Sequence, residues 1–236
     1  MIRFYAPDIV STGLLPESDS AHCVRVLRMG VGDEIEVVDG RGGLHRCVIR
    51  EAHSKHTYVD VVESLELPKV WRGSINIAIA PTKHADRMEW LVEKLVEIGV
   101  DRITPLRCRY SERKEIKTER LEKIAVSAMK QSLKAVLPQI DEMMPYGDFM
   151  RQCDTEQRFI AYCDPSIPRL LFSKEFKPFT DATILIGPEG DFSAEEIKQA
   201  LDAGWTPISL GDNRLRTETA ALVACDTCHI IDQINS

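Results

Sequence analysis

A cation and two carboxylates stand beside two glycine-bearing loops in the carboxyl-terminal third of the chain. Residues 187–190 (Gly-Pro-Glu-Gly) form the first loop, and Gly211 opens a second that leads to Arg216 and Glu218. The loops can present backbone amides and carbonyls to a ligand, and a cation such as Arg216 can stabilise a developing negative charge. The alternative for Arg216 is a salt bridge to Glu189 or Glu218.

Each loop is entered from a short apolar run and leaves into a predicted helix. Residues 183–186 and 207–210 are the runs, and their length is typical of buried strands. Ser193 and Glu196 predict a capping box at the start of the first helix, and Gly204 marks its end. Two such units side by side bring both loops to the carboxyl ends of their strands, where open α/β sheets bind ligands. Either loop alone is also compatible with an ordinary turn, and the chain has neither a Walker A pattern nor G-x-G-x-x-G.

Composition limits the classes of function. The chain has 236 residues, 28% of them charged, and a formal net charge of −7. Any contact with nucleic acid must therefore use a local basic patch. No apolar run reaches membrane-spanning length, and the first residues lack a signal-peptide pattern. We expect a cytoplasmic protein without a membrane partner.

The seven cysteines are an odd and scattered set, which favours reduced thiols over a disulfide framework. Cys225, Cys228 and His229 form a C-x-x-C-H pattern, which can mark haem attachment. The pattern falls inside the predicted last helix, and no second ligand pair has the spacing of a zinc site. We interpret these cysteines as packing residues and expect no metal.

A break in the pattern around residues 67–73 divides the chain. Before the break, short β-branched segments predict strands at residues 34–38, 44–49 and 57–62. After it, an apolar strand, a helix ending at Gly99 and a second strand alternate, which predicts a parallel sheet with helices on both faces. We therefore predict a β domain at residues 1–70 and an α/β domain at residues 71–236.

Residues 102–134 are the most basic part of this acidic chain. Arg107, Arg109 and Arg113 lie around Tyr110 in a predicted loop, and arginines interleaved with a tyrosine can pair with phosphates and stack on bases. Arg25 and Arg28 form a second basic pair near the amino terminus. The alternative for each group is a solvated surface.

Several motifs resemble those of the RsmE family. The two loops read GPEG-x-FS and SLG-x-x-x-LRTETA, and residues 22–40 contain H-x-x-x-VLRM and G-D-x-I-x-V-x-DG. Members of that family are S-adenosylmethionine-dependent 16S rRNA uridine N3-methyltransferases of the SPOUT superfamily. The resemblance implies an amino-terminal PUA-like β-barrel that recognises RNA and a carboxyl-terminal SPOUT trefoil-knot methyltransferase domain. It also implies a homodimer formed through the carboxyl-terminal helix.

The resemblance assigns roles to individual residues. It implies S-adenosyl-L-methionine as cofactor and the 16S rRNA of the small ribosomal subunit as partner. The implied catalytic residues are Arg216, Glu189 and Glu218, with Arg216 stabilising the negative charge of a uridine that has lost its N3 proton. The implied cofactor-binding residues are Leu185, Ile186, Gly187, Pro188, Glu189, Gly190, Leu210, Gly211, Leu215, Arg216, Thr217, Thr219 and Ala220. The implied RNA-binding residues are Arg25, Arg28, Lys83, Arg107, Arg109 and Arg113.

The chain departs from the family pattern at a few positions. Asp191 stands where relatives have glycine, Lys130 and Lys134 replace a glutamate and an arginine, and Arg214 follows Asn213 where many relatives place an arginine differently. One alternative function is that of another SPOUT enzyme, which methylates tRNA or a ribose 2′-hydroxyl. A second is that of a non-catalytic RNA-binding adaptor. Cofactor binding separates the adaptor from both enzymes, and the position of the methyl group separates the enzymes.

Overall fold

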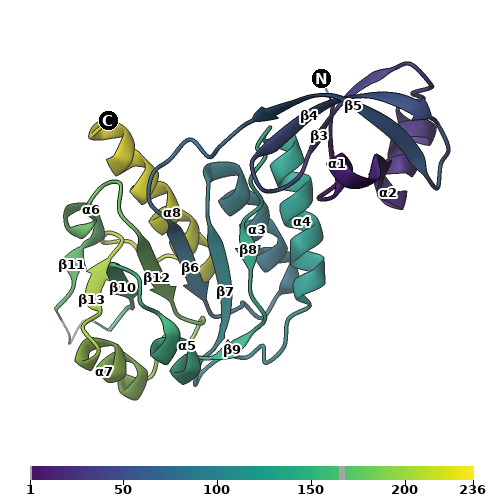
Figure 1. Ribbon diagram of the computed structural model, residues 1–236. Helices are drawn as coiled ribbons and strands as arrows, with labels where there is room; N and C mark the ends of the chain where they lie inside the picture. Colours follow the sequence, from purple (N-terminus) through teal and green to yellow (C-terminus); the bar gives the residue numbers. More distant parts are fainter. Residues whose placement is uncertain (1, 165–167) are drawn as a thin grey trace. The chain divides into compact units, whose positions relative to one another are not determined.

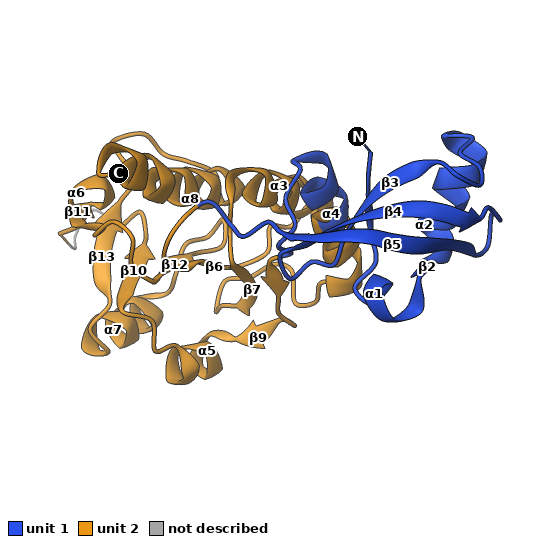
Figure 2. Cartoon of the chain, turned by 45° about the horizontal axis from the view of Figure 1, so that its top comes forward, with its two compact units in different colours: residues 1–70, 126–137 blue, residues 71–125, 138–236 orange. Residues whose placement is uncertain are grey.

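The computed structural model describes residues 2–164 and 168–236. The chain separates into two compact units, which Figure 2 shows in different colours. Unit 1 comprises residues 1–70 and 126–137, and unit 2 comprises residues 71–125 and 138–236. In the described residues, no helix has both the length and the apolar character needed to cross a membrane.

Unit 1 is built on a five-stranded sheet in the order β1-β3-β4-β5-β2. Its strands are β1 (Arg3–Tyr5), β2 (Leu14–Leu15), β3 (Glu34–Val38), β4 (Gly43–Glu51) and β5 (Thr57–Glu66). The pairs are antiparallel except for β1 with β3. Side chains from all five strands, among them Phe4, Leu15 and Ile35, join one buried cluster. The sheet therefore curves around a single core, which confirms the predicted small barrel-like domain.

The turn between β3 and β4 contains two glycines in left-handed conformations. Val38 pairs with Leu44, so residues 39–43 connect a hairpin, and Gly40 and Gly42 have positive φ angles of 78° and 104°. Short helices α1 (Ile9–Thr12) and α2 (Glu17–Ala21) complete the unit, and α2 continues into a π-helix, η1 (His22–Val26). The sequence of residues 22–29 predicts a short helix or strand, and the structure shows a helix over His22–Val26.

Residues 126–137 pack in unit 1 although they are distant from it in the sequence. They comprise the end of α4 (Thr118–Gln131) and the segment that follows it. The Gly42 amide donates to the Ala135 carbonyl at 3.0 Å, and the Leu137 amide donates to the Gly40 carbonyl at 2.9 Å. Lys130, one of the departures from the family pattern, forms an ion pair with the buried Asp19 at 2.9 Å. Unit 1 is therefore not a contiguous stretch of sequence.

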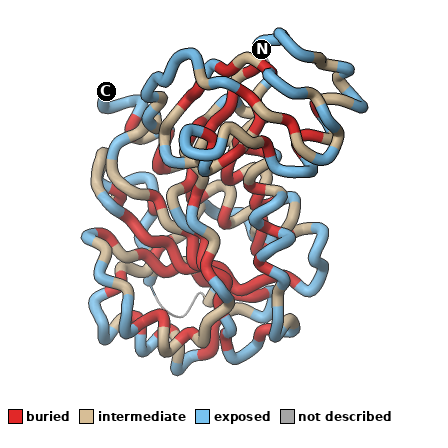
Figure 3. The backbone as a smooth tube through the Cα atoms, turned by 45° about the vertical axis from the view of Figure 1, so that its right-hand side comes forward, coloured by how far each residue is buried: buried red, intermediate tan, exposed pale blue. Residues whose placement is uncertain are grey.

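Unit 2 contains a parallel sheet in the order β11-β13-β10-β12-β6-β7-β8. Its strands are β6 (Ile75–Ile79), β7 (Arg102–Arg107), β8 (Gln139–Ile140), β10 (Gln157–Ala161), β11 (Leu170–Leu171), β12 (Ala182–Ile186) and β13 (Thr206–Ser209). A further short strand, β9 (Met144–Pro145), pairs with the end of β7. All five residues of β12 are buried, as expected where helices cover both faces of a parallel sheet. Figure 3 shows the buried stretches of the chain in red.

Helices lie on both faces of this sheet (Figure 1). On one face, α8 (Thr217–Ile234) packs against β6, β12 and α3 (Ala85–Ile98), with α6 (Phe172–Glu175) beside it. On the other, α5 (Tyr146–Gln152) and α7 (Ala194–Asp202) enclose a buried cluster that includes Leu185 and Trp205. The predicted α/β architecture is confirmed, and β10 is inserted between β12 and β13, the strands that carry the two glycine loops.

Candidate active site

A cavity of about 520 Å³ lies at the carboxyl ends of β10, β12 and β13. Its wall combines residues 186–191 of the first glycine loop with Ser209–Gly211 of the second. Residues 213–217 and Ala220, at the start of α8, add a further side, and residues 161–163 close the cavity from β10. The two loops that the sequence predicts to lie together therefore line one cavity.

The first loop is held by close packing and by Asp191. A side chain at Gly187 would place its Cβ 3.0 Å from the Phe192 ring, which is closer than most such contacts, so Phe192 would have to shift to admit one. Asp191 has φ 67°, a left-handed conformation that glycine adopts freely and aspartate tolerates better than most residues. Its carboxylate accepts from the Cys163 amide at 2.8 Å and from the Phe192 amide at 2.9 Å. The aspartate at this family glycine position thus ties the first loop to the end of β10.

The predicted capping box starts α7 directly after this loop. The Glu196 amide donates to Ser193 Oγ at 3.2 Å, and the Ser193 amide donates to Glu196 Oε2 at 2.9 Å. Two helix-terminal amides are satisfied in this way, which fixes the point where the chain leaves the cavity wall.

The second loop turns tightly and delivers Arg216 to the start of α8. The Gly211 amide donates to Ser209 Oγ at 3.2 Å, and Gly211 has φ 119°, a conformation that side chains rarely permit. Arg216 is the N-cap residue of α8 and makes no side-chain cap, so the first amides of the helix have no side-chain acceptor there. The positive end of the helix dipole and the exposed guanidinium thus lie on the same wall of the cavity.

The carboxylates have partners other than Arg216. Glu218 is buried, and its Oε1 lies 3.6 Å from Arg87 Nη1, while its Oε2 has no hydrogen-bond partner within the described part of the chain. Glu189 is exposed, and its Oε1 accepts from the Lys83 amide at 3.0 Å. Among the described residues, no ion pair joins Arg216 to either glutamate. Its guanidinium is left available to a ligand.

Most of the residues predicted to bind the cofactor line the cavity. They are Ile186, Gly187, Pro188, Glu189, Gly190, Leu210, Gly211, Leu215, Arg216, Thr217 and Ala220. Leu185 instead points into the buried cluster beneath α5 and α7. Thr219 lies in the first turn of α8 and is half-buried.

The structure adds lining residues that the sequence analysis did not assign to the site. These are Arg87, Ala161, Tyr162, Cys163, Arg169, Asp191, Ile208, Ser209, Asn213 and Arg214. Residues 161–163 join the site because β10 lies between β12 and β13, a strand order that the local sequence does not reveal. The apolar run of β10 was the available signal, since in an α/β sheet each buried parallel strand brings its own carboxyl end to the ligand edge.

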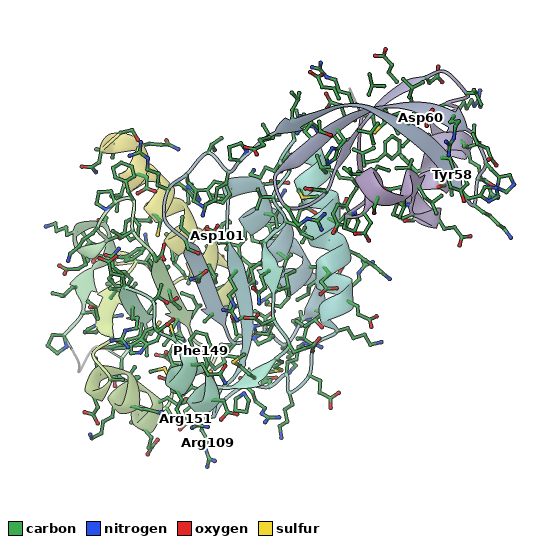
Figure 4. All side chains as sticks on the ribbon, in the orientation of Figure 1. Tyr58, Asp60, Asp101, Arg109, Phe149 and Arg151 are labelled. Carbon is green, nitrogen blue, oxygen red and sulfur yellow. The ribbon has the colours of Figure 1, made fainter. Side chains whose placement is uncertain are left out.

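The predicted RNA-binding residues fall into both units. Arg25 and Arg28 are exposed in unit 1, where Arg25 donates to Ser54 Oγ at 3.0 Å. In unit 2, Arg113 donates to the carbonyls of Thr82 and Lys83 at 3.0 and 2.6 Å, so it links two loops. Lys83 forms an exposed ion pair with Glu112, and Arg107 and Arg109 are exposed, with Arg109 extending outward in Figure 4.

The C-x-x-C-H pattern lies inside α8 as expected, with its polar groups directed at Gly99. Cys225 Sγ donates to the Gly99 carbonyl at 3.3 Å, and His229 Nε2 lies 2.6 Å from the same oxygen. Burial raises the pKa of both the Cys225 and the Cys228 thiol, so neither is a ready thiolate ligand. In the regions that the structure describes, no cluster of three potential ligands could hold a metal ion.

Comparisons with known proteins agree with this architecture. Residues 70–229 match the model of an RNA methyltransferase domain, and residues 15–62 match that of an RNA methyltransferase PUA domain. A probable rRNA methyltransferase from Porphyromonas gingivalis has a crystal structure that is 47% identical and superposes with a TM-score of 0.95 over 100% of both chains.

Two further relatives carry more specific names. Ribosomal RNA small subunit methyltransferase E from Neisseria gonorrhoeae, solved bound to S-adenosyl methionine, is 25% identical with a TM-score of 0.85 over 98% of both chains. The protein of the same name from Rickettsia conorii is 27% identical over 212 residues, which are 89% of this chain and 86% of the relative.

Proposed function

The chain belongs to the RNA methyltransferase family, and we propose that it transfers a methyl group from S-adenosylmethionine to N3 of one uridine in 16S rRNA. The observation that carries this proposal is that both glycine loops and Arg216 line one cavity. No carboxylate of the described residues neutralises the guanidinium of Arg216. The names of the relatives from Neisseria gonorrhoeae and Rickettsia conorii supply the substrate class.

The cavity fits the proposed cofactor. Its volume of about 520 Å³ lies within the usual range for small-molecule sites, roughly 300–1,000 Å³. Ile186, Ile208 and Leu215 supply an apolar surface for a flat ring, and the backbone of the two loops supplies donors and acceptors for its edge. The Cβ position at Gly211 has no heavy atom within 4 Å, so the loop leaves open space on that side. When bound, S-adenosylmethionine supplies an electrophilic methyl group on a sulfonium ion.

The protein's own residues must favour the deprotonated uridine. N3 of uridine carries a proton at neutral pH, and its loss spreads negative charge onto O2 and O4. Arg216 and the amino-terminal end of α8 are placed to stabilise that charge, as donors do in an oxyanion hole. Arg87 holds the buried Glu218 by an ion pair, whereas Glu189 is exposed on the cavity wall, and we assign Glu189 the role of accepting the N3 proton.

We assign the two units different tasks and the whole protein a dimeric state. Unit 1 recognises RNA through exposed cations that include Arg25 and Arg28, and unit 2 transfers the methyl group through a SPOUT-type knotted domain.

Ile230 and Ile234 on α8 are 47% and 76% exposed, and this apolar strip supports a homodimer formed through that helix. The small ribosomal subunit, maturing in the cytoplasm, is the proposed partner.

Two measurements test the function. Reverse transcription across 16S rRNA from cells with and without the protein should stop at one uridine only when the protein is present, because an N3-methyl blocks the pairing edge. Calorimetry should detect S-adenosylmethionine binding to the wild type and none to Ala220→Leu, which fills the cavity from α8 while keeping a helix-compatible side chain. If the protein binds S-adenosylmethionine but reverse transcription does not stop, the methyl acceptor is tRNA or a ribose hydroxyl. If the protein does not bind S-adenosylmethionine, it is an RNA-binding adaptor.

Light scattering tests the assembly. The protein should have the mass of a dimer at micromolar concentration, and Ile230→Asp should give a monomer because it buries a charge in the proposed interface. A wild-type monomer that retains activity would exclude this assembly.

A further inference from the structure

The loop between β7 and α4 has a fixed conformation beside the cavity. The Cys108 amide donates a hydrogen bond to Ser111 Oγ at 3.0 Å, and the Ser111 amide donates one to the Cys108 carbonyl at 3.2 Å. The Arg109 amide donates to Glu196 Oε1 at 2.8 Å, and the guanidinium of Arg113 binds the carbonyls of Thr82 and Lys83. These bonds hold the loop on both sides of Tyr110.

Tyr110 is the apolar side chain that this loop presents to solvent. It is 53% exposed, in contrast to the buried Cys108 and Ser111 that flank it within the turn. No hydrogen bond of its hydroxyl to the described residues is present. A single exposed aromatic is common on protein surfaces, so its meaning depends on where the loop places it.

The loop places Tyr110 at the rim of the cavity. A Cβ built on Gly190, which lines the cavity, would lie 3.3 Å from Tyr110 Cβ and 4.0 Å from its Cγ. The backbone of Gly190 therefore lies close to the base of the Tyr110 side chain, and the absence of a side chain at Gly190 leaves room for this approach. The base of an exposed aromatic side chain is thus held beside the loop that lines the cavity, and its ring extends into solvent there.

We propose that Tyr110 is the stacking platform for the target uridine, an inference that rests on the proposed function of the cavity. A uridine must leave its stack for N3 to reach the cofactor, and it loses its neighbouring bases when it does so. Aromatic side chains replace such lost stacking in proteins that bind unpaired bases. The adjacent Arg107 and Arg109 are exposed and can bind the phosphates on either side of the flipped nucleotide.

Glu196 acts as a positioning residue for this platform. Its Oε2 completes the capping box with the Ser193 amide, and its Oε1 holds the Arg109 amide next to Tyr110. Both bonds require an acceptor, so a carboxylate satisfies them together. Glutamine offers one acceptor oxygen and one donor nitrogen, and it can keep only one of the two bonds.

The test compares Tyr110→Leu with Tyr110→Phe, using small ribosomal subunits from cells that lack the protein. Leucine keeps apolar volume without an aromatic face, and we expect kcat/KM to fall about 10- to 100-fold, the range for one base–aromatic stack. The loss should appear in KM and also in subunit binding measured without cofactor, because stacking precedes the chemical step. Phenylalanine should retain wild-type values, and both variants should bind S-adenosylmethionine normally.

Three results would overturn the proposal. If Tyr110→Leu has the kcat/KM and subunit binding of the wild type, Tyr110 is not a stacking platform. If Tyr110→Leu and Tyr110→Phe lose equally, the hydroxyl and not the ring binds the RNA. A parallel loss of S-adenosylmethionine affinity would show that Tyr110 only supports the cofactor loop. A wild-type protein that binds the cofactor but leaves 16S rRNA unmethylated contradicts the proposed function and not the role of Tyr110. In that case the affinity of Tyr110→Leu for the small subunit still tests whether Tyr110 binds RNA.

Glu196→Gln and Glu195→Gln form a matched pair for the positioning role. Glu195 is exposed on the same helical turn and serves as the control. We expect Glu196→Gln to raise KM for the subunit with little change in S-adenosylmethionine affinity, and Glu195→Gln to change neither. In a Tyr110→Leu background, Glu196→Gln should add no further loss, because the ring it positions is gone. A full additional loss in the double variant would show that Glu196 acts independently of Tyr110.

Discussion

Arg216 is the residue on which the proposed chemistry depends most. Its guanidinium is exposed on the cavity wall, and neither Glu189 nor Glu218 neutralises it within the described structure. Arg216→Ala should therefore lower kcat by about a hundredfold or more, as loss of one donor to a developing anion does, while S-adenosylmethionine affinity changes little. Single-turnover kinetics and calorimetry on the same variant separate the two effects.

Arg214 is the matched comparison for Arg216, since it is an exposed cation on the same wall. Arg214→Ala should leave the single-turnover rate close to that of the wild type. If Arg214→Ala carries the large loss and Arg216→Ala does not, Arg214 is the cation that meets the reacting base.

The Arg87–Glu218 pair makes a different prediction at the same scale. Glu218 is buried and already has one oxygen without a partner among the described residues, so Arg87 is its compensating charge. Arg87→Ala should destabilise the protein by about 1–3 kcal/mol, since it leaves a buried carboxylate unpaired. Urea unfolding measures the change, and adding Glu218→Gln to Arg87→Ala should recover part of it. Unchanged stability in Arg87→Ala would mean that solvent reaches Glu218.

At the scale of elements, α7 depends on its capping box. Ser193 Oγ accepts from the Glu196 amide, and the Ser193 side chain is buried at the helix start. Ser193→Ala should lower the free energy of unfolding by about 1 kcal/mol, and Glu195→Gln should lower it by less, because it removes only an exposed charge from the first turn. A smaller effect of Ser193→Ala than of the control would show that the helix start is held by packing of Ile197 and Phe192 instead.

The elements were largely predictable because their signals are local. The apolar runs became β12 and β13, and the Ser193–Glu196 pair formed the cap that its spacing indicates. Strand order is not local, and for that reason the contribution of residues 161–163 to the cavity was missed. The positive φ of Asp191 could not be predicted from the local sequence either. The folded loop shows how aspartate replaces glycine at this position.

At the scale of the whole molecule, the sequence boundary near residue 70 is only part of the division. Residues 126–137 pack in unit 1, where Lys130 pairs with Asp19 and Ala135 accepts from Gly42. A fragment that begins near residue 71 would keep this segment and lose its partners. A loss of activity in this fragment could therefore come from lost structure as well as from lost RNA recognition. Point substitutions in unit 1 separate the two causes.

Arg25 and Arg28 provide that test. The protein carries a net charge of −7, so its affinity for RNA must rest on a few placed phosphate contacts and not on general attraction. Arg25→Ala with Arg28→Ala should weaken binding to the small subunit and flatten its salt dependence by about one unit of logarithmic slope for each phosphate that the variant no longer binds. Arg46→Ala is the control, because Arg46 is an exposed cation of the same unit that already pairs with Glu63. Cofactor affinity should be unaffected in both variants, and an unchanged salt slope in the double variant would place RNA recognition on other residues.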